Sequence, residues 1–390
     1  MTKGNGEIFG QLLVKNKPYT ITNSKIAVFT WTGCEVTIKG KCESVYVSEE
    51  TPMVSYINTH AALNRMRNDA KAKVVKYGPV VVIAGPKDSG KSTLARILLS
   101  YAVRCDWKPA FVDLDVGQNE ITMPGCIAAT PVDEQVGIQS KWSAPLVYYY
   151  GHTSPAKNKE IYTRICAKLA DAVQKRCQRN ASARHSGVII NTSGWIDGVG
   201  QELLLRIAKS FKADVVLVID HEKLLSDLKN SEEMKEMGTT VIKLDKSGGV
   251  VSRNADRRSD LRAARIRSYF YGSINNKLSP HEKVISFKDV LVYRMGGATR
   301  APASTLPLGQ KPMLDPNRVM KIGITERLKN TVLAVSFAKK PEEILEINIA
   351  GLIYVKDVDT KKQKLTILAP SAGNLPHSFL LLGSIQWYDS

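Results

Sequence analysis

The sequence lacks any run of about 18 uninterrupted apolar residues, the length that a membrane-spanning helix needs, so we expect no membrane partner. The first ten residues, MTKGNGEIFG, lack the apolar core of a signal peptide, which argues against secretion. The six cysteines include no Cys-x-x-Cys pair, and none has a histidine at zinc-finger spacing. We therefore expect reduced thiols in a cytosolic or nuclear protein.

Acidic residues are in short supply. Lys and Arg number 55 against 37 Asp and Glu, which gives a formal net charge of +18. This excess of positive charge indicates a polyanionic partner, with nucleic acid as the leading candidate. Lysines that are merely solvated would give the same net charge. The length of 390 residues allows two or three domains, each with a core of its own.

The spacing of apolar residues changes twice along the chain. Short alternating strands are predicted at the N-terminus, as in a small antiparallel sheet or sandwich, and a helix over 51–75 then joins two domains. From Pro79 apolar strands alternate with helices of about 10–15 residues, which indicates a parallel sheet covered on both faces. Short strands and turns return near Tyr269. We predict an N-terminal β-sandwich over 1–62, an α/β domain over 63–272 and a C-terminal α+β domain, mixed and rich in β-strands, over 273–390.

The predicted elements follow from these patterns. The N-terminal strands are expected over 7–14, 17–22, 25–31, 34–40 and 44–48. The later strands are expected over 80–84, 109–117, 146–151, 186–194 and 213–220, and the helices over 92–105, 160–177 and 202–211.

The stretch GPKDSGKST, residues 85–93, follows the apolar run PVVVIA and matches the P-loop (Walker A) pattern G-x4-G-K-[ST]. Glycines let the backbone N–H groups face the β- and γ-phosphates, at the positive end of the next helix. Lys91 would bridge the β- and γ-phosphates, and the Ser92 hydroxyl would bind Mg²⁺. Asp88 could instead face the phosphate acceptor. The predicted ATP-binding residues are Gly85, Asp88, Ser89, Gly90, Lys91, Ser92 and Thr93.

Carboxylates end the next predicted strand, in FVDLDVGQ. Alternation places Asp113 and Asp115 on one side of the strand. One of them can hold Mg²⁺ through water or accept a proton from an attacking hydroxyl. Asp115 is the candidate for both roles because it lies further out along the strand. A solvated aspartate at a strand end remains the alternative, and a stronger one for Asp113.

Three features bear on the phosphate acceptor. Trp195 lies in the glycine-flanked turn NTSGWIDG after a buried strand, where an indole could stack on a base or fill a gap in the core. The segment 252–267 places Arg258, Arg262 and Arg265 on one helix face, which suits either a phosphoryl-transfer lid or a solvated basic helix. Thr153, in GHTSP, could donate to a phosphate of the acceptor strand, while His152 is as consistent with a structural role.

Several of these stretches together resemble one eukaryotic family. They are GPKDSGKSTLARILLSYAVR, DLDVGQ, PGCIAA, APLVYYYGHTSP, VIINTSGW, SGGVV with the arginine segment, and IRSYFYG. The family is that of the polyribonucleotide 5′-hydroxyl kinases that are also subunits of the pre-mRNA 3′-end cleavage and polyadenylation machinery. The likeness continues in GCEVTIKG and SEETPMVSYINTHAALNRMR before the P-loop, and in VSFAKKPEEI and LLLGSIQWYD after it.

The resemblance implies that the α/β domain over 63–272 is a P-loop polynucleotide kinase domain. It implies an enzyme that uses ATP and Mg²⁺ to phosphorylate the 5′-hydroxyl end of RNA. It implies nuclear partners as well: the tRNA-splicing endonuclease and factors of mRNA 3′-end processing. It assigns Lys91 and Ser92 to the Walker A site and Asp115 to the Walker B carboxylate, which is also the base. Thr153 would contact acceptor RNA, Trp195 would clamp its first base, and Lys25 would approach the adenosine. The implied lid residues are Arg253, Arg258 and Arg262, and we take Arg258 as the catalytic one.

Two departures from the family pattern concern other positions. The family carries a further strand before GEIFG, with a glutamate that contacts the base, so either adenine recognition is incomplete here or the sequence has been shortened at that end. Asp113 also stands where glutamate is common. Two alternative functions stay open: an ATP-binding scaffold with little turnover, and a DNA-repair kinase, because no motif shows which groups would contact a 2′-hydroxyl.

Overall fold

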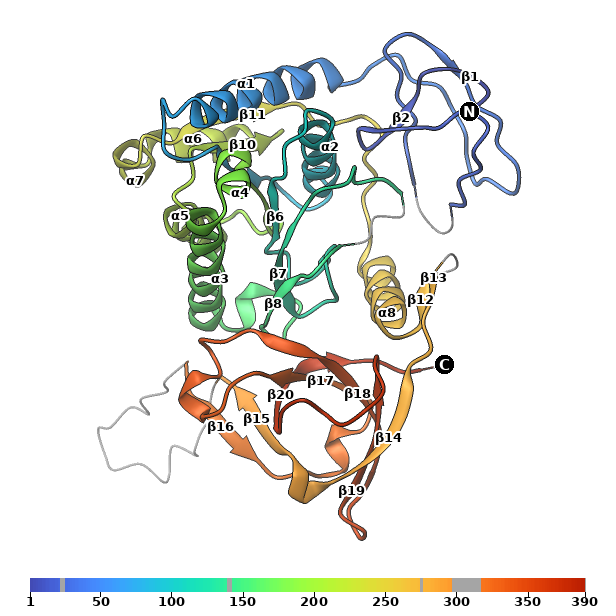
Figure 1. The fold of residues 1–390 in the computed structure, drawn as a ribbon, viewed down its shortest axis with the longest axis vertical. Coiled ribbons are helices and arrows are strands. Elements are labelled where there is room, and N and C mark those ends of the chain that lie inside the picture. The colour runs from blue at the N-terminus through green and yellow to red at the C-terminus, as the bar shows by residue number, and fades with distance from the viewer. Residues whose placement is uncertain (22–24, 139–141, 274–275, 297–316, 390) are drawn as a thin grey trace. The chain divides into compact units, whose positions relative to one another are not determined.

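The computed structural model describes residues 1–21, 25–138, 142–273, 276–296 and 317–389 (Figure 1). The chain divides into two compact units. Unit 1 comprises Met1–Val112, Thr130–Ala144 and Val173–Ser252, and unit 2 comprises Asp113–Ala129, Pro145–Ala172 and Arg253–Ser390. The domain boundaries at 62/63 and 272/273 stay a prediction.

The N-terminal strands of unit 1 are much shorter than predicted. β1 (Lys3–Gly4) pairs with β4 (Cys34–Glu35), and β2 (Glu7–Ile8) pairs with β3 (Gln11–Leu12), both antiparallel. The described parts of the predicted strands over 17–22 and 44–48 contain no strand. The alternation in the second of them has no buried side, because Val47 is 95% exposed. Without a surface to cover, alternation alone does not form a strand.

The predicted helix that follows is confirmed as α1 (Met53–Lys71). Its buried residues include Tyr56, Leu63 and Ala70, and the helix packs on α2 (Lys91–Arg104) and α4 (Ala181–Ser186). Arg67 is 1% exposed, and its Nε donates to the Ser186 carbonyl at 2.9 Å. The joining helix is therefore part of the core of unit 1.

A seven-stranded sheet has the order β11-β10-β5-β9-β6-β7-β8. Its strands are β5 (Val80–Ala84), β6 (Ala110–Asp113), β7 (Cys126–Pro131), β8 (Leu146–Tyr149), β9 (Val188–Asn191), β10 (Val215–Ile219) and β11 (Thr240–Leu244). The pairs β11–β10, β10–β5 and β5–β9 are parallel, as predicted, whereas β8 is antiparallel to β7. The sequence analysis missed β7 and β11.

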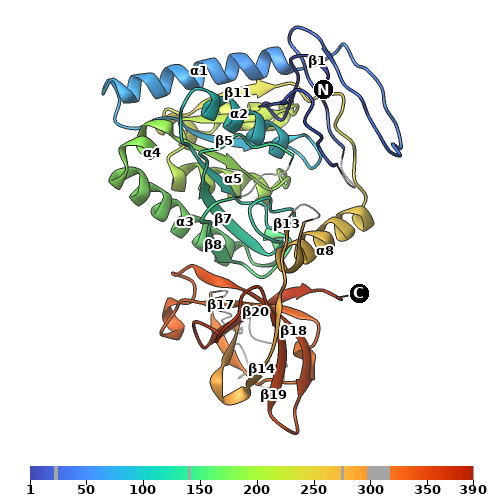
Figure 2. The same cartoon turned by 45° about the vertical axis from the view of Figure 1, so that its right-hand side comes forward.

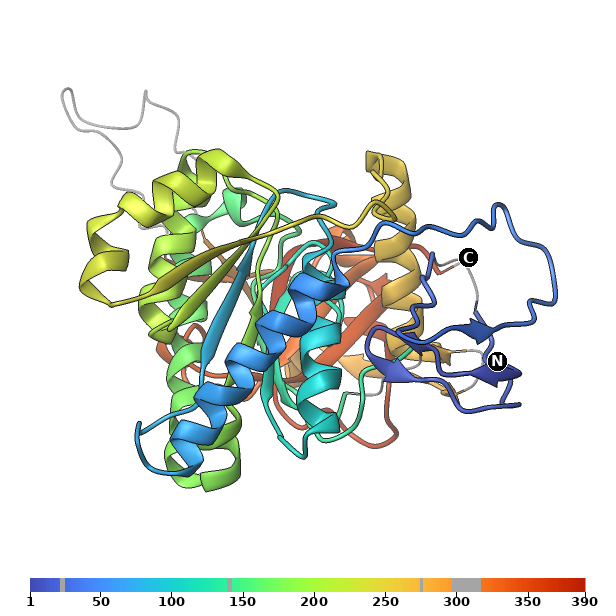
Figure 3. The same cartoon turned by 90° about the horizontal axis from the view of Figure 1, so that it is seen from above.

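The remaining helices of the chain are α3 (Lys159–Arg179), α5 (Val199–Phe211), α6 (Glu222–Asn230), α7 (Glu232–Glu236) and α8 (Ala255–Tyr271). In unit 1, α2 packs on β5 and β9, α5 on β5, and α6 on β11. Figure 3 shows α1 and α2 on one side of the strands of this unit, with α6 and α7 on the other. The expected cover on both faces is present, and it explains why β5 and β10 consist of apolar residues throughout.

The C-terminal part of unit 2 is a second seven-stranded sheet, of order β14-β19-β18-β17-β20-β15-β16 (Figure 2). Its strands are β14 (His281–Ser286), β15 (Leu291–Met295), β16 (Val319–Ile322), β17 (Thr331–Ser336), β18 (Ile349–Asp359), β19 (Lys364–Ala369) and β20 (Phe379–Gln386). The pair β15–β20 is parallel and the other pairs are antiparallel.

The core of this sheet includes Val292, Leu333, Val355, Ile367 and Leu380. The short strands β12 (Gly272–Ser273) and β13 (Asn276–Lys277) pair ahead of it. The described residues after Tyr271 form strands and the 3₁₀ turns η2 (Phe287–Asp289), η4 (Glu326–Leu328) and η5 (Pro341–Glu343), but no α-helix, whereas we predicted an α+β domain. In the described part of the whole chain, no helix is apolar over a length that would span a membrane.

Candidate phosphate-binding and phosphoryl-transfer site

The predicted P-loop connects β5 to α2 in unit 1. Gly90 precedes the first residue of α2 with φ of 93°, a left-handed conformation that favours glycine, and a Cβ there would lie 3.2 Å from Val250 Cγ2. No side chain caps this end of the helix. The first-turn N–H groups of α2 are thus left to an anion, and the helix dipole favours negative charge at the same place.

Lys91 closes the loop in this structure. Its side chain is buried, and Nζ donates to the carbonyls of Gly85 at 2.9 Å and Pro86 at 2.7 Å. A buried ammonium makes stronger hydrogen bonds with a charged phosphate oxygen than with neutral carbonyls, so a bound phosphate would stabilise Lys91 in this position. Ser89 is also buried, and its hydroxyl has no hydrogen-bond partner among the described residues.

The other predicted P-loop residues differ in exposure. Ser92 is half-buried, and its Oγ accepts from Asn191 Nδ2 at 3.3 Å, at the end of β9. Asp88 is half-buried and Thr93 is exposed. Lys25 is exposed, and the structure gives it no contact with the loop. The sequence analysis missed Asn191, although a polar residue that ends a buried strand was a signal for it.

The Trp195 turn lies against the P-loop in the same unit. Thr192 Oγ1 donates to the carbonyl of Ile83 at 2.7 Å, which ties the ends of two neighbouring strands together. Gly194 approaches so closely that a Cβ on it would lie 2.7 Å from backbone atoms of Lys87. Trp195 itself is half-buried. The structure therefore brings the turn with this indole to the phosphate-binding loop.

The acidic turn after β6 begins unit 2. Asp113 is fully buried, and its carboxylate accepts from the N–H groups of Asp115 at 3.0 Å and Glu120 at 2.6 Å. Burial, followed by the negative charge of Asp115, raises the pKa of Asp113 to about 8. β6 ends at Asp113. The prediction of one strand that presents both carboxylates on the same side is therefore wrong, and the two groups have different surroundings.

Asp115 is half-buried, and only one of its oxygens is used within the turn. Oδ1 accepts from the N–H groups of Gly117 at 2.8 Å and Gln118 at 3.2 Å. Oδ2 accepts no hydrogen bond from a described residue. The turn fixes the orientation of this carboxylate and leaves one oxygen for a ligand or a proton.

Thr153 belongs to a loop that packs on this turn. The Thr153 side chain is exposed, and its carbonyl oxygen would lie 3.0 Å from a Cβ on Gly117. His152 Nδ1 lies 2.8 Å from Ser384 Oγ, and the pKa of its imidazole is lowered by burial and by the charges of Lys157 and Arg294. A neutral, tethered ring supports the structural role for His152.

The arginine segment forms α8, as predicted, with Asn254 as the N-cap that accepts from Arg257 N. Arg253 precedes the helix and is exposed, while Arg258 and Arg262 are half-buried. Gln118 Nε2 donates to the Arg258 carbonyl at 3.3 Å. The sequence analysis missed Gln118, for which the only signal was its place directly after the predicted strand.

The candidate residues thus form two groups. Unit 1 holds the P-loop and Trp195, and unit 2 holds Asp115, Thr153 and the lid arginines. Within unit 1 the Trp195 turn lies against the P-loop, and within unit 2 the loop of Thr153 and the backbone of Arg258 contact the turn of Asp115. Among the described residues no cluster of three or more His, Cys, Asp or Glu side chains could hold a metal ion, so a Mg²⁺ site here would need a hydroxyl or phosphate oxygen in its shell.

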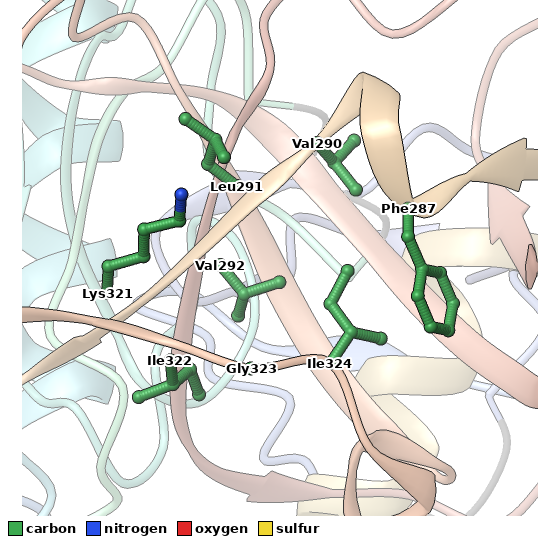
Figure 4. Close-up of a pocket in the computed structure, with 8 residues that line it drawn as sticks. All are labelled: Phe287, Val290, Leu291, Val292, Lys321, Ile322, Gly323 and Ile324. Carbon is green, nitrogen blue, oxygen red and sulfur yellow. The ribbon is translucent and has the colours of Figure 1, made fainter. Parts of the chain in front are cut away.

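Two cavities lie away from these residues. The first, of about 220 Å³, is at the edge of the C-terminal sheet (Figure 4) and is lined by Phe287, Val290, Leu291, Val292, Lys321, Ile322, Gly323 and Ile324. The second, of about 210 Å³, is in unit 1 and is lined by Trp31, Ile57, His60, Tyr101, Arg104 and Cys105. Neither contains a residue that we predicted for phosphate or RNA.

Three family profiles match the chain in succession. Residues 1–70 match the N-terminal β-sandwich domain of polyadenylation factor, residues 85–272 the P-loop of mRNA cleavage and polyadenylation factor CLP1, and residues 278–389 the pre-mRNA cleavage complex II protein Clp1. Together they span most of the described chain.

Relatives and solved structures agree with these matches. The chain is 44% identical over 399 residues to "Protein CLP1 homolog" of Arabidopsis thaliana, covering 100% of this chain and 89% of the relative. It is 42% identical over 390 residues to the human "Polyribonucleotide 5'-hydroxyl-kinase Clp1", covering 99% of this chain and 90% of the relative. A solved complex of Clp1p with Pcf11p shares the fold, with a TM-score of 0.83 at 24% identity over 100% of this chain and 93% of the other. The chain belongs to the CLP1 family.

Proposed function

We propose that this protein is an RNA kinase that transfers the γ-phosphate of ATP to the 5′-hydroxyl end of RNA, with Mg²⁺. The observation that carries the proposal is the uncapped start of α2 behind the glycine loop of Gly85 and Gly90, with the buried Lys91 ammonium above it. This cradle occurs in a chain of the CLP1 family, whose human and chicken relatives are named polyribonucleotide 5'-hydroxyl-kinase.

The loop fits a nucleoside triphosphate. The N–H groups at the start of α2 would bind phosphate oxygens, and Lys91 would exchange its two carbonyl partners for oxygens of the β- and γ-phosphates. Asp88, Ser89 and Thr93 complete the loop. Lys25 would approach the adenosine, as the family resemblance implies.

The donor set also fits Mg²⁺. The Ser92 hydroxyl would bind the ion directly and the Asp115 carboxylate would hold it through a water, with the rest of its oxygen shell from phosphate and water. Asn191 orients the Ser92 hydroxyl, and the turn orients Asp115. Bound Mg²⁺ would offset negative charge on the phosphates.

The acceptor is handled by the remaining residues. Trp195 would stack on the first base of the RNA, and Thr153 would donate to a phosphate further along the strand. The 5′-hydroxyl oxygen attacks the γ-phosphorus, the bond to the β-phosphate oxygen breaks, and the proton passes to Asp115 Oδ2. Arg258 would stabilise the charge of the transferred group, with Arg253 and Arg262 as the other lid residues.

The cellular setting follows from the family. We propose that the protein acts in the nucleus, in mRNA 3′-end processing and in tRNA splicing. Its partners would be the cleavage factors of the pre-mRNA 3′ end and the tRNA-splicing endonuclease. Support comes from the family description, pre-mRNA cleavage complex II, and from the solved complexes of Clp1p with Pcf11p.

The test is transfer of labelled γ-phosphate from ATP and Mg²⁺ to matched 5′-hydroxyl RNA and DNA oligonucleotides. Lys91→Ala should reduce transfer by more than about 100-fold, while Lys229→Ala, at an exposed helix position, should not change it. Trp195→Ala should reduce kcat/KM for RNA by about 10- to 100-fold, and Trp195→Phe should retain most of the activity because a phenyl ring still stacks.

Each other outcome has a definite meaning. No transfer to either oligonucleotide, with ATP bound, would contradict the proposal and leave an ATP-binding scaffold. Transfer to DNA with no preference for RNA would contradict the substrate class. Equal activity of Trp195→Ala and the wild type would remove the base clamp.

A further inference from the structure

The guanidinium of Arg265 binds the backbone of the segment that follows Asp115. Nε donates to the Thr122 carbonyl at 2.7 Å, and Nη2 donates to the Glu120 carbonyl. The planar fork of arginine can satisfy two acceptors of one turn at the same time, which a single ammonium cannot do with the same geometry. Arg265 therefore fastens α8 to the segment that follows Asp115.

That segment is itself held together by side chains. Asn119 Oδ1 accepts from the N–H groups of Ile121 at 3.0 Å and Thr122 at 2.9 Å. Asn119 Nδ2 donates to the carbonyls of Asp113 and Cys126, both at 3.2 Å. The turn is thus bonded at both of its ends, and a contact with Thr122 is transmitted to the backbone beside Asp115.

A second contact joins the same two parts of unit 2. Gln118 donates its N–H to Asp115 Oδ1 and its side-chain amide to the Arg258 carbonyl. Arg258 and Arg265 are seven residues apart on one helix face, a separation of about 10 Å. The last turn of α8 packs on the C-terminal sheet through Phe270, and these two contacts hold the arginine-rich half of the helix against the turn at two points.

We propose that Arg265 is a positioning residue, which with Gln118 holds Arg258 and Arg262 in a fixed register with the Asp115 carboxylate. The role rests on the proposed kinase function, and it adds a residue that the lid positions do not include. Arg262 is half-buried and lies between Arg258 and Arg265 on the helix, so its position depends on how the helix is held. Groups that act on developing charge must already be in place when the bond breaks.

The test compares Arg265→Gln with Arg267→Gln in the full-length protein. Arg267 lies on the same helix, is exposed and makes an ion pair with Asp389 at 3.3 Å. Because an exposed ion pair contributes little to stability, Arg267→Gln should change kcat and the amide exchange of α8 only slightly. For Arg265→Gln we expect kcat to fall by about 10- to 100-fold, with KM for ATP and for RNA changed by less than about 3-fold, since the lid acts on the transition state. Arg265→Lys should recover only part of the loss, because it keeps the charge without the fork.

A readout without catalysis separates this role from the kinase proposal. Backbone amides of residues 258–265 should exchange with solvent about 10-fold faster in Arg265→Gln than in Arg267→Gln, because local opening becomes easier. Should Arg265→Gln fail to fold, Gln118→Ala removes the other contact and should lower kcat by about 10-fold.

The outcomes are distinguishable. A wild-type protein that transfers no phosphate contradicts the proposed function itself. If the wild type is active, three results for Arg265→Gln would contradict the positioning role alone. They are an unchanged kcat, a rise in KM without a change in kcat, and an amide exchange of α8 equal to that of the control.

Discussion

At the scale of single residues, close backbone approaches shape the phosphate-binding loop. Gly90 permits the left-handed turn into α2, and Gly194 lets the Trp195 turn lie against Lys87. Lys91 then folds back over the loop carbonyls. The loop is therefore supported from outside its own motif, and a change in the Trp195 turn should affect nucleotide binding.

Gly194→Ala tests this coupling. A methyl group there would lie 2.7 Å from the backbone of Lys87, so either the P-loop or the Trp195 turn must move. We expect the Kd for ATP to rise by about 10-fold or more and the free energy of unfolding to fall by about 1–3 kcal/mol. Calorimetric titration and denaturant unfolding measure the two effects. Gly323→Ala is the control, since a Cβ there meets no atom within 4 Å, and equal ATP affinity in both variants would disprove the coupling.

At the scale of elements, the far end of α8 is anchored by aromatic side chains. Phe270 is fully buried and stacks on Trp387 with ring centroids 5.8 Å apart, and Tyr269 Oη accepts from the Leu352 N–H at 3.0 Å. Tyr271 Oη donates to Asp389. The packing of the C-terminal half of α8 thus stabilises the whole helix, including the arginine-rich half, in which the positive charges repel one another.

Trp387→Ala should destabilise unit 2. Trp387 is 5% exposed, and removal of its ring from between the sheet and α8 should lower the free energy of unfolding by about 3–5 kcal/mol. Trp387→Phe should cost less, about 1–2 kcal/mol, because an aromatic ring remains against Phe270. Urea unfolding followed by circular dichroism measures both. A loss below about 1 kcal/mol for the alanine variant would show that the stack does not anchor the helix.

At the scale of the whole molecule, the net charge of +18 acts on any long polyanion. Binding of an RNA that contacts several phosphates releases counterions, so the affinity should fall steeply with salt. If about 3–5 phosphates are contacted, the slope of log K against log salt should be about −2 to −4 for a single strand.

Fluorescence anisotropy with a labelled 5′-hydroxyl RNA, between about 50 and 200 mM salt, measures this slope. A slope near zero would mean that the positive charge does not serve RNA binding. The Arg265→Gln variant provides a comparison, and its slope should equal that of the wild type because Arg265 already binds backbone carbonyls.

Much of the candidate site was visible in the sequence because its signals are local. The P-loop needs two glycines, a lysine and a hydroxyl within nine residues, and the structure places them at the start of α2 as predicted. The helices α1, α2 and α8 follow from apolar or charged periodicity over 14 residues or more. The prediction of long N-terminal strands was wrong because alternation of apolar and polar residues predicts a strand only where one side is buried.

Other properties were decided by tertiary structure alone. Asp113 and Asp115 are two residues apart, and only their order along the chain favoured Asp115, yet the structure separates them by burial. Asp113 is fully buried with a raised pKa, whereas Asp115 is half-buried and uses only Oδ1 in the turn. Arg265 looks like a fourth lid arginine until its carbonyl partners, more than 140 residues earlier, are known. The sequence by itself determined which groups are candidates for the chemistry, since that depends on residue type and short spacing. The tertiary structure decided which of those groups are free to act, because burial and hydrogen-bond partners come from residues far apart in the chain.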